Sequence, residues 1–190
     1  MRVRSLKADD LALIAAIDRS EHVDVQYAVI DGQLTEQPVT ISEIPRWDAT
    51  GSGEHSVAGH IDFCAPLLAG GAVLLGAFHD EASDERQPAG LAVVDPAFEP
   101  RLAWLAWLHV SRPYRRRGAG RALWDAATEL AVGAGAESLY VSATPTGSAV
   151  GFYLGRGCRL ADPVHPALFA HEPEDIHLVC ALGDRLLPRD

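Results

Sequence analysis

The sequence has a single lysine, Lys7, and only three cysteines, and it lacks paired Cys or His spacings and long apolar runs. A Walker A loop ends in Gly-Lys-Ser or Gly-Lys-Thr, so this phosphate-binding loop is excluded. The eight histidines are scattered and form no HExxH motif, so we expect no metal site. The N-terminus lacks the apolar stretch of a signal peptide, and no segment is long enough to span a bilayer. We therefore expect a soluble, cytoplasmic protein with no membrane partner.

The three cysteines are Cys64, Cys158 and Cys180, an odd number at irregular spacing with no CxxC pair. Disulfide frameworks of small secreted domains use even numbers of cysteines at regular spacings. The count therefore predicts reduced thiols.

Acidic residues outnumber basic ones by 26 to 16, and the formal net charge is −10. Nucleic acids and anionic membranes attract basic surfaces, so this balance argues against general binding to either. An acidic surface suits a cationic substrate, although solubility alone explains it equally well. Four of the 16 basic residues lie within 112–117, which makes that segment a local exception.

The order of elements predicts one mixed domain of 190 residues, with antiparallel strands first and a strand–helix–strand crossover later. Expected helices start at Asp10, Ser56, Gly118 and Gly147, with Gly157 ending the last of them. Asp31 and Gly32 supply the turn of a hairpin over 25–36. The other expected strands lie at 2–6, 72–80, 89–96, 101–110, 139–144 and 176–182, with a charged, exposed loop at 81–87.

The segment "RPYRRRGAGRAL", residues 112–123, joins the strand at 101–110 to the helix that follows. The first amides of a helix have no internal partners and carry the positive end of its dipole. Gly118 and Gly120 let another group approach this backbone closely, and the arginines add forked donors. The pattern favours a phosphate or pyrophosphate site over a solvated run of charge. It is not the dinucleotide fingerprint GxGxxG, because Leu123 stands where the third glycine belongs.

Two segments of this region resemble the acetyl-CoA-binding segments of the GNAT superfamily of N-acetyltransferases. The family's Q/R-x-x-G-x-G/A pattern is matched by "RRRGAG", residues 115–120. One helix and one strand later, "SAVGFYLGRGCRL", residues 148–160, is similar to the family's A-x-x-F-Y-x-x-x-G-F/C stretch. The resemblance is good over 102–160 and extends to the rest of the chain only by element order.

This resemblance implies a mixed α/β (α+β) fold: a largely antiparallel sheet of six to seven strands, flanked by about four helices and splayed near the cofactor. It implies a single N-acetyltransferase domain over 1–190. Residues 102–160 would form its acetyl-CoA-binding and catalytic core, and the helices and loops of 8–70 would frame the acceptor.

The resemblance also implies roles for individual residues. The backbone of Leu108, His109 and Val110 would pair with the pantetheine arm of acetyl-CoA. The pyrophosphate would be held by the amides of Arg115, Arg116, Arg117, Gly118, Ala119, Gly120 and Arg121. Tyr153 matches the tyrosine that protonates the departing thiolate in many members, a role open to a neutral phenol; alternatively, it is a core aromatic beside Phe152.

The sequence departs from the family pattern at two positions. Thr146 stands where many members have an asparagine, which shortens the reach of that side chain toward the cofactor. The strand at 101–110 has no acid to serve as general base, and its only candidate base is His109. A water chain to Glu21, Glu54 or Asp62 is the alternative base.

The acceptor side is predicted around residues 17–27, where Glu21 and His22 are candidate substrate residues; a solvated helix end explains these polar residues equally well. Strand alternation places Trp107 on the same face as His109, so Trp107 is a third candidate. The leading prediction is an acetyl-CoA-dependent N-acetyltransferase for a small-molecule amine, with no nucleic-acid partner, as a monomer or homodimer. A protein N-terminal or lysine acetyltransferase and a non-catalytic CoA-binding sensor are the alternatives.

Overall fold

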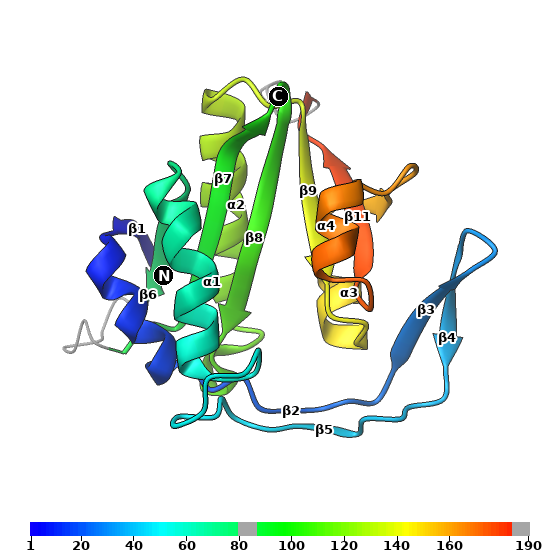
Figure 1. Ribbon diagram of the computed structural model, residues 1–190, viewed down its shortest axis with the longest axis horizontal. Helices are drawn as coiled ribbons and strands as arrows, with labels where there is room; N and C mark the ends of the chain where they lie inside the picture. The colour runs from blue at the N-terminus through cyan, green and yellow to red at the C-terminus, as the bar shows by residue number, and fades with distance from the viewer. Residues whose placement is uncertain (80–86, 184–190) are drawn as a thin grey trace.

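The computed structural model describes residues 1–79 and 87–183, and Figure 1 shows a mixed sheet with helices on both faces. The sheet has seven strands in the order β1-β6-β7-β8-β9-β11-β10. In that order they are Arg2–Leu6, Val73–Phe78, Gly90–Glu99, Leu102–Val110, Ser138–Ala143, Ile176–Ala181 and Arg159–Leu160. All neighbours are antiparallel except β8 and β9. The predicted largely antiparallel sheet is thus confirmed. The loop predicted at 81–87 lies outside the described residues apart from Gln87.

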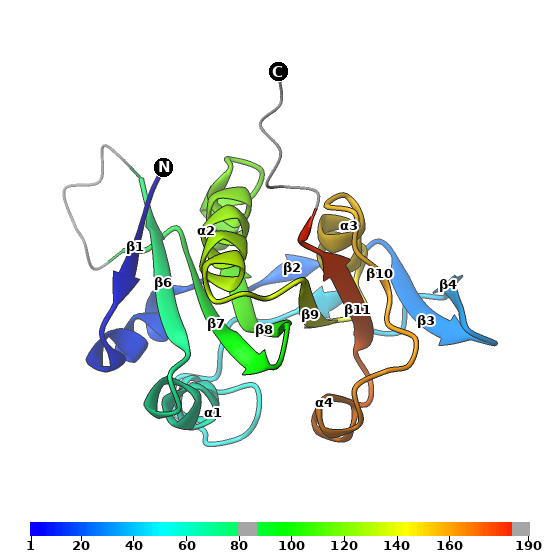
Figure 2. The same cartoon turned by 90° about the horizontal axis from the view of Figure 1, so that it is seen from above.

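Helices form one layer on each face of the sheet, as seen from above in Figure 2. On one face lie α2, Ala119–Gly133, and α3, Gly147–Leu154; on the other lie α1, Val57–Ala69, and α4, Pro166–His171. A 3-10 helix, η1, Ala8–Ala16, packs beside α1. The helix predicted from Asp10 is therefore a 3-10 helix, and α4 was not predicted, because its six residues are too few to show a helical period.

The core lies on both faces of the sheet because β7 and β8 are covered twice. On the α2 face, Leu123, Trp124 and Ala127 are fully buried against the sheet. On the α1 face, Trp104 and Trp107 of β8 pack in a second cluster. Two buried faces explain why the central strands read as continuous apolar runs rather than alternating ones.

Strands β8 and β9 separate along their length, and Figure 1 shows the gap between them widening toward α3. Their parallel pairing covers only Leu102–Leu105 of β8 and Ser138–Val141 of β9. A register shift opposite Val93 and Val94 of β7 marks a bulge at Ala106 of β8. The bulge bends β8 away from β9, so residues from Ala106 to Val110 have one edge without a strand partner. The predicted splay is present.

Residues 20–45 form two short ribbons apart from the main sheet. β2, Glu21–His22, pairs with β5, Glu43–Ile44, and β3, Gln26–Ile30, pairs with β4, Gln33–Gln37. Asp31 and Gly32 have φ values of 50° and 75°, so the predicted hairpin turn is confirmed. The β2–β5 ribbon was not predicted, since two-residue strands leave no pattern. The helix α3 ends at Leu154, three residues before the stop predicted at Gly157.

The prediction that all cysteines are reduced is wrong for two of them, because Cys158 and Cys180 form a disulfide. Arg159 of β10 pairs with Val179 of β11, and this antiparallel register places Cys158 opposite Cys180, with 4.2 Å between their Cα atoms. Spacing along the chain contains no information about such a cross-strand register. Cys64 is buried in α1 and remains a free thiol.

Reduction of this disulfide is expected to destabilise the protein. The bond spans a sequence separation of 22 residues, and closing a loop of this size removes about 3 kcal/mol of chain entropy from the unfolded state. Urea unfolding with and without dithiothreitol measures the difference, with Cys64→Ala as the control that leaves it unchanged. Coincident unfolding curves, or three titratable thiols in the unreduced, denatured protein, would contradict the pairing.

Two features are absent from the described residues. None of their helices combines the length and the apolar character that a membrane crossing requires. No group of three or more His, Cys, Asp or Glu side chains within 1–79 and 87–183 is arranged to hold a metal ion.

Candidate active site

The start of α2 presents a row of unused backbone amides. Gly118 is the N-cap, with φ of 90° and no side-chain cap, and the helical ladder begins with the bond from the Ala122 amide to the Gly118 carbonyl. No hydrogen-bond partner occurs in the described part of the chain for the amides of Arg116, Gly118, Ala119, Gly120 and Arg121. Free amides at the positive end of a helix dipole suit a phosphate or pyrophosphate.

Gly118 and Gly120 serve this row of amides in different ways. A Cβ on Gly118 would meet nothing within 4 Å, so glycine is required there for its positive φ. A Cβ on Gly120 would lie 3.1 Å from Phe152 of α3 and 3.4 Å from Val110 of β8. Gly120 therefore allows α2, α3 and the end of β8 to approach one another closely.

The Arg115 side chain points away from these amides and braces the end of β8. Its guanidinium donates to the carbonyls of Val110, at 3.2 Å, and Arg19, at 2.8 Å, and pairs with Glu21 at 3.2 Å. The Arg115 amide donates to the Arg112 carbonyl of η2, Arg112–Tyr114, and the Arg117 amide donates to the Tyr114 carbonyl. The amides of Arg115 and Arg117 thus already donate hydrogen bonds within the described part of the protein, whereas the other amides predicted to hold the pyrophosphate do not. The side chains of Arg116, Arg117 and Arg121 are exposed.

The end of β8 offers a strand edge beside these amides. Leu108, His109 and Val110 pair with β7 on one side only, because the pairing with β9 stops at Leu105. An extended ligand is able to add to such an edge as a further strand. The structure thus brings the predicted pantetheine and pyrophosphate segments together at one end of the crossover.

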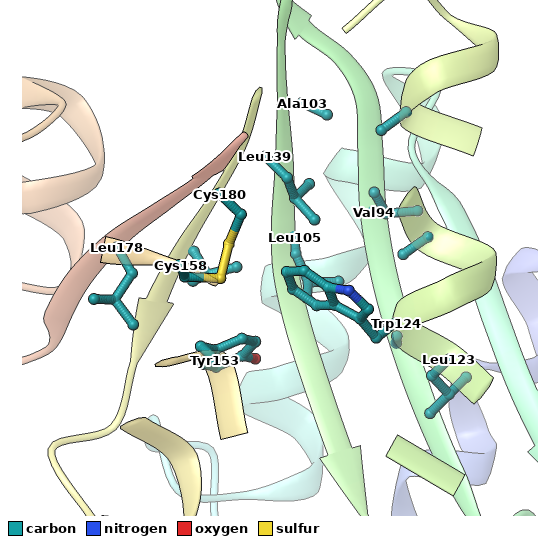
Figure 3. Close-up of a cluster of buried hydrophobic side chains, with 14 of the residues drawn as sticks. Val94, Ala103, Leu105, Leu123, Trp124, Leu139, Tyr153, Cys158, Leu178 and Cys180 are labelled. Atoms are coloured by element: carbon teal, nitrogen blue, oxygen red, sulfur yellow. A yellow bond between two sulfur atoms is a disulfide. The ribbon is translucent and has the colours of Figure 1, made fainter. Parts of the chain in front are cut away.

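Tyr153 lies on α3 across the splay, buried to 7% exposure. Its ring packs on Phe152 and Trp124, with centroids 5.1 and 5.7 Å apart. Figure 3 shows its oxygen directed from α3 toward β8. Burial, followed by the charge of Asp175, raises the pKa of the phenol well above its usual value. The hydroxyl therefore keeps its proton at neutral pH, and it has no hydrogen-bond partner among the described residues.

Thr146 is occupied by a structural contact. It is buried and caps α3, with its hydroxyl accepting a hydrogen bond from the Ala149 amide at 3.4 Å. Its backbone also bridges to Gln26 of β3. The side chain therefore holds the helix that carries Tyr153, which is a different use from the cofactor contact that the sequence predicts.

On the α1 face, His109 lies in a cluster of aromatic rings. Its ring centroid is 4.5 Å from that of Trp107, 5.0 Å from Trp47 and 6.2 Å from His60. The Trp107 indole donates to Nδ1 of His60 at 3.0 Å. Trp107 and His109 share a face, as alternation predicts. His60 and Trp47 were missed, because His60 lies on α1 outside any motif and Trp47 lies in a loop.

Burial sets the protonation of both imidazoles in this cluster. It lowers the pKa of His109 to about 3, with the charges of His60, Arg19 and Arg115 as further causes. It lowers the pKa of His60 to about 4, with Arg19 and His55 contributing. Both imidazoles are therefore neutral at pH 7, and the same burial makes them weak bases.

The acidic residues suggested from the sequence lie elsewhere. Glu21 is paired with Arg115, and Glu54 and Asp62 are exposed. His22 lies on the β2–β5 ribbon with its Nδ1 2.6 Å from Glu43, and this hydrogen bond raises its pKa. None of these side chains joins the ring cluster around His109.

Two carboxylates that the sequence did not single out lie between α4 and β11. Burial raises the pKa of Glu172, and burial together with the charge of Glu172 raises that of Asp175 to about 7. Both also raise the pKa of Tyr153. No motif marks them, and the short helix α4 before them was itself not predicted.

Comparisons with known proteins agree with this arrangement. The sequence model of the acetyltransferase (GNAT) family matches residues 42–157. A search of curated proteins found no match. A solved nourseothricin acetyltransferase is 22% identical, with a TM-score of 0.67 over 95% of this chain and 98% of that one.

Two further solved structures extend the likeness. A putative streptothricin acetyltransferase from Bacillus anthracis str. Ames, in complex with acetyl coenzyme A, is 15% identical, with a TM-score of 0.60 over 95% of this chain and 96% of the other. The PaiA N-acetyltransferase from Thermoplasma acidophilum, in complex with coenzyme A, is 14% identical, with a TM-score of 0.58 over 95% and 98%. At these identities the likeness concerns the fold.

Proposed function

Because the chain belongs to the acetyltransferase (GNAT) family, we propose that it transfers an acetyl group from acetyl-CoA to a primary amine of a small molecule. Membership makes it an acyltransferase with acetyl-CoA as co-substrate. The observation that carries the proposal is the row of unpartnered amides at the start of α2 beside the unpaired end of β8. We infer one N-acetyltransferase domain, with cofactor groups from 102–160 and acceptor groups from 8–70.

The residues present fit the cofactor. The amides of Arg116 and of Gly118 to Arg121 would hold the pyrophosphate, and the backbone of Leu108 to Val110 would hold the pantetheine arm. When bound, acetyl-CoA supplies an acetyl group activated as a thioester. Ternary-complex transfer then needs only two proton movements from the protein, one at the amine and one at the departing sulfur.

We assign the two proton movements to His109 and Tyr153. His109 is neutral and so has a free imidazole lone pair for the proton that the amine loses as the nitrogen bonds to the acetyl carbon, although burial makes it a weak base. Tyr153 keeps its proton and donates it to the thiolate. The two side chains come from opposite sides of the splay, His109 from β8 and Tyr153 from α3. This arrangement suits a transfer in which the amine attacks from one side of the acetyl group and the thiolate departs on the other.

A small acceptor is favoured over a polypeptide by a contact between α1 and α4. The Phe63 ring of α1 stacks on His171 of α4, with centroids 5.0 Å apart and planes at 21°. Both helices cover the same face of the sheet (Figure 2), and Phe63 also lies 6.1 Å from Trp104 of β8. We infer that this bridge narrows the space between the two helices and leaves little room for an extended peptide. The names nourseothricin and streptothricin acetyltransferase also point to small acceptors.

Turnover with a panel of amines tests this function. We expect acetyl-CoA-dependent acetylation of at least one small amine, at more than about tenfold the rate with a peptide that offers a free N-terminus and a lysine. The rate should rise between pH 6 and 9 as the amine loses its proton, because His109, with its pKa at about 3, is already neutral there. Tight CoA binding with no acetylated product would indicate a sensor, and a preferred peptide would indicate a protein acetyltransferase.

A further inference from the structure

Arg19 follows η1 and carries a positive charge without a counterion. Its guanidinium lies over the Trp47 ring, 4.4 Å from the centroid, and burial lowers its pKa. The neighbouring acids are committed to other arginines: Asp18 pairs with Arg46 at 2.7 Å and Glu21 with Arg115 at 3.2 Å. Within 1–79 and 87–183, the Arg19 guanidinium has neither an ion pair nor a hydrogen bond. A half-buried cation in this state favours an anion that arrives from outside.

Two further donors in the same cluster also lack partners. Trp47 is 7% exposed, and its indole Nε1 is buried without an acceptor in the described part of the chain. His60 receives a hydrogen bond at Nδ1 from Trp107, so its proton is on Nε2. That Nε2 is likewise buried without a partner. An unmatched buried donor is destabilising, and an arriving acceptor oxygen removes this penalty.

The three donors are grouped around one ring. The Trp47 centroid lies 4.2 Å from that of His60, and the Arg19 guanidinium lies over Trp47. The same ring lies 5.0 Å from His109, the residue assigned to accept the proton of the amine. An anion held here would lie beside His109, on the α1 face of β8. The site is therefore positive close to the reaction, although the protein as a whole is acidic.

We propose that Arg19, Trp47 and His60 form a carboxylate-binding subsite, so that the preferred acceptor is an amino acid or a similar amine with a nearby carboxylate. The inference rests on the proposed N-acetyltransferase function and adds the class of acceptor. Arg19 supplies charge-assisted donors, and the indole and imidazole N–H groups fix the position of the oxygens. Purely cationic amines lack a group that satisfies these donors.

Matched pairs of acceptors test the subsite: L-phenylalanine against 2-phenylethylamine, and L-lysine against cadaverine. We expect the carboxylate to raise kcat/KM by about tenfold to a hundredfold, as for a buried hydrogen bond to a charged group. Arg19→Gln and Trp47→Phe should each remove most of this preference, measured as the ratio of kcat/KM within each pair. The control is Arg46→Gln, an exposed arginine nearby, which should keep the preference.

Equal rates within each pair would overturn the subsite and leave the N-acetyltransferase function intact. An equal loss for both members in Arg19→Gln would also overturn it, because Arg19 would then only support packing. A fall in acetyl-CoA affinity in that variant would reassign Arg19 to the cofactor.

A binding measurement keeps the two proposals separate. In the CoA-bound protein, sodium acetate should shift the Trp47 indole N–H resonance, which is assigned by its loss in Trp47→Phe. Sodium chloride at equal ionic strength should not shift it, and Arg19→Gln should abolish the acetate response. A shift without acetylation of any amine would support the subsite and reject the function. The absence of a shift would reject the subsite whatever the activity.

Discussion

Tyr153→Phe is expected to lower kcat by about a hundredfold or more, the usual range for loss of a general acid. The variant keeps the ring that packs on Phe152 and Trp124, so the fold and the binding of acetyl-CoA should be retained. It removes only the hydroxyl, which Figure 3 shows directed toward β8. Steady-state kinetics give kcat, and calorimetric titration with CoA gives the affinity, which should stay within about twofold.

The protonation of Tyr153 explains why a phenol suits this position. Burial raises its pKa, and Asp175 and Glu172 raise it further. The pKa of Asp175 is itself about 7, so Asp175 acquires its charge as the pH rises through neutrality. That charge favours the neutral phenol more strongly as the pH increases. Tyr153 therefore remains a proton donor across the range in which amines become nucleophilic, and its titration should not limit activity below pH 9.

Tyr140→Phe is the matched control for Tyr153→Phe. Tyr140 is also buried, on β9, but its hydroxyl accepts a hydrogen bond from the His165 amide at 3.1 Å. Its loss should cost about 1 kcal/mol of stability and leave kcat unchanged. Equal kcat values in Tyr153→Phe and the wild type would show that the proton reaches the sulfur from another group, such as a water molecule.

The backbone features of the proposed cofactor side were predictable because they are local in sequence. The positive φ of Gly118 is a property of that residue's own backbone, and the free amides after it occur at the start of any helix. Strand alternation likewise placed Trp107 with His109 on one face. Each of these features depends on residues within a few positions of one another, so the pattern of residues contains them.

The acceptor side was not predictable in the same way. Trp47 lies in a loop, His60 on α1 and His109 on β8, and only the packing of α1 against the sheet brings their rings together. The Cys158–Cys180 bond depends on the register between β10 and β11. Arg115 is a further example: its charge predicted a phosphate ligand, whereas its side chain braces Val110 and Glu21. Long-range contacts of this kind leave no periodicity or motif.

Gly118→Val is expected to weaken acetyl-CoA binding by at least about a hundredfold. The backbone at Gly118 has φ of 90°, and a Cβ there would meet nothing within 4 Å, so the substitution acts through conformation. A β-branched residue is strained in this region and should shift φ to negative values. That change turns the amides of Ala119 to Arg121 away from a common target. Loss of one or two hydrogen bonds to a charged group costs about 1.5–3 kcal/mol each, which accounts for the expected factor.

Gly120→Val and Gly133→Val distinguish an effect of the Gly118 backbone conformation from a general loss of stability. At Gly120 a Cβ would press on Phe152 at 3.1 Å, so that variant should lose stability as well as affinity. Gly133 is exposed at the far end of α2, and a Cβ there would meet nothing, so Gly133→Val should alter neither. Calorimetric titration with CoA and thermal melts distinguish the three variants.

If Gly118→Val bound CoA as tightly as Gly133→Val, the pyrophosphate would have to lie on the exposed side chains of Arg116 and Arg117 instead of the amides. Binding should then weaken steeply with salt, whereas amides at a helix start depend on salt only weakly.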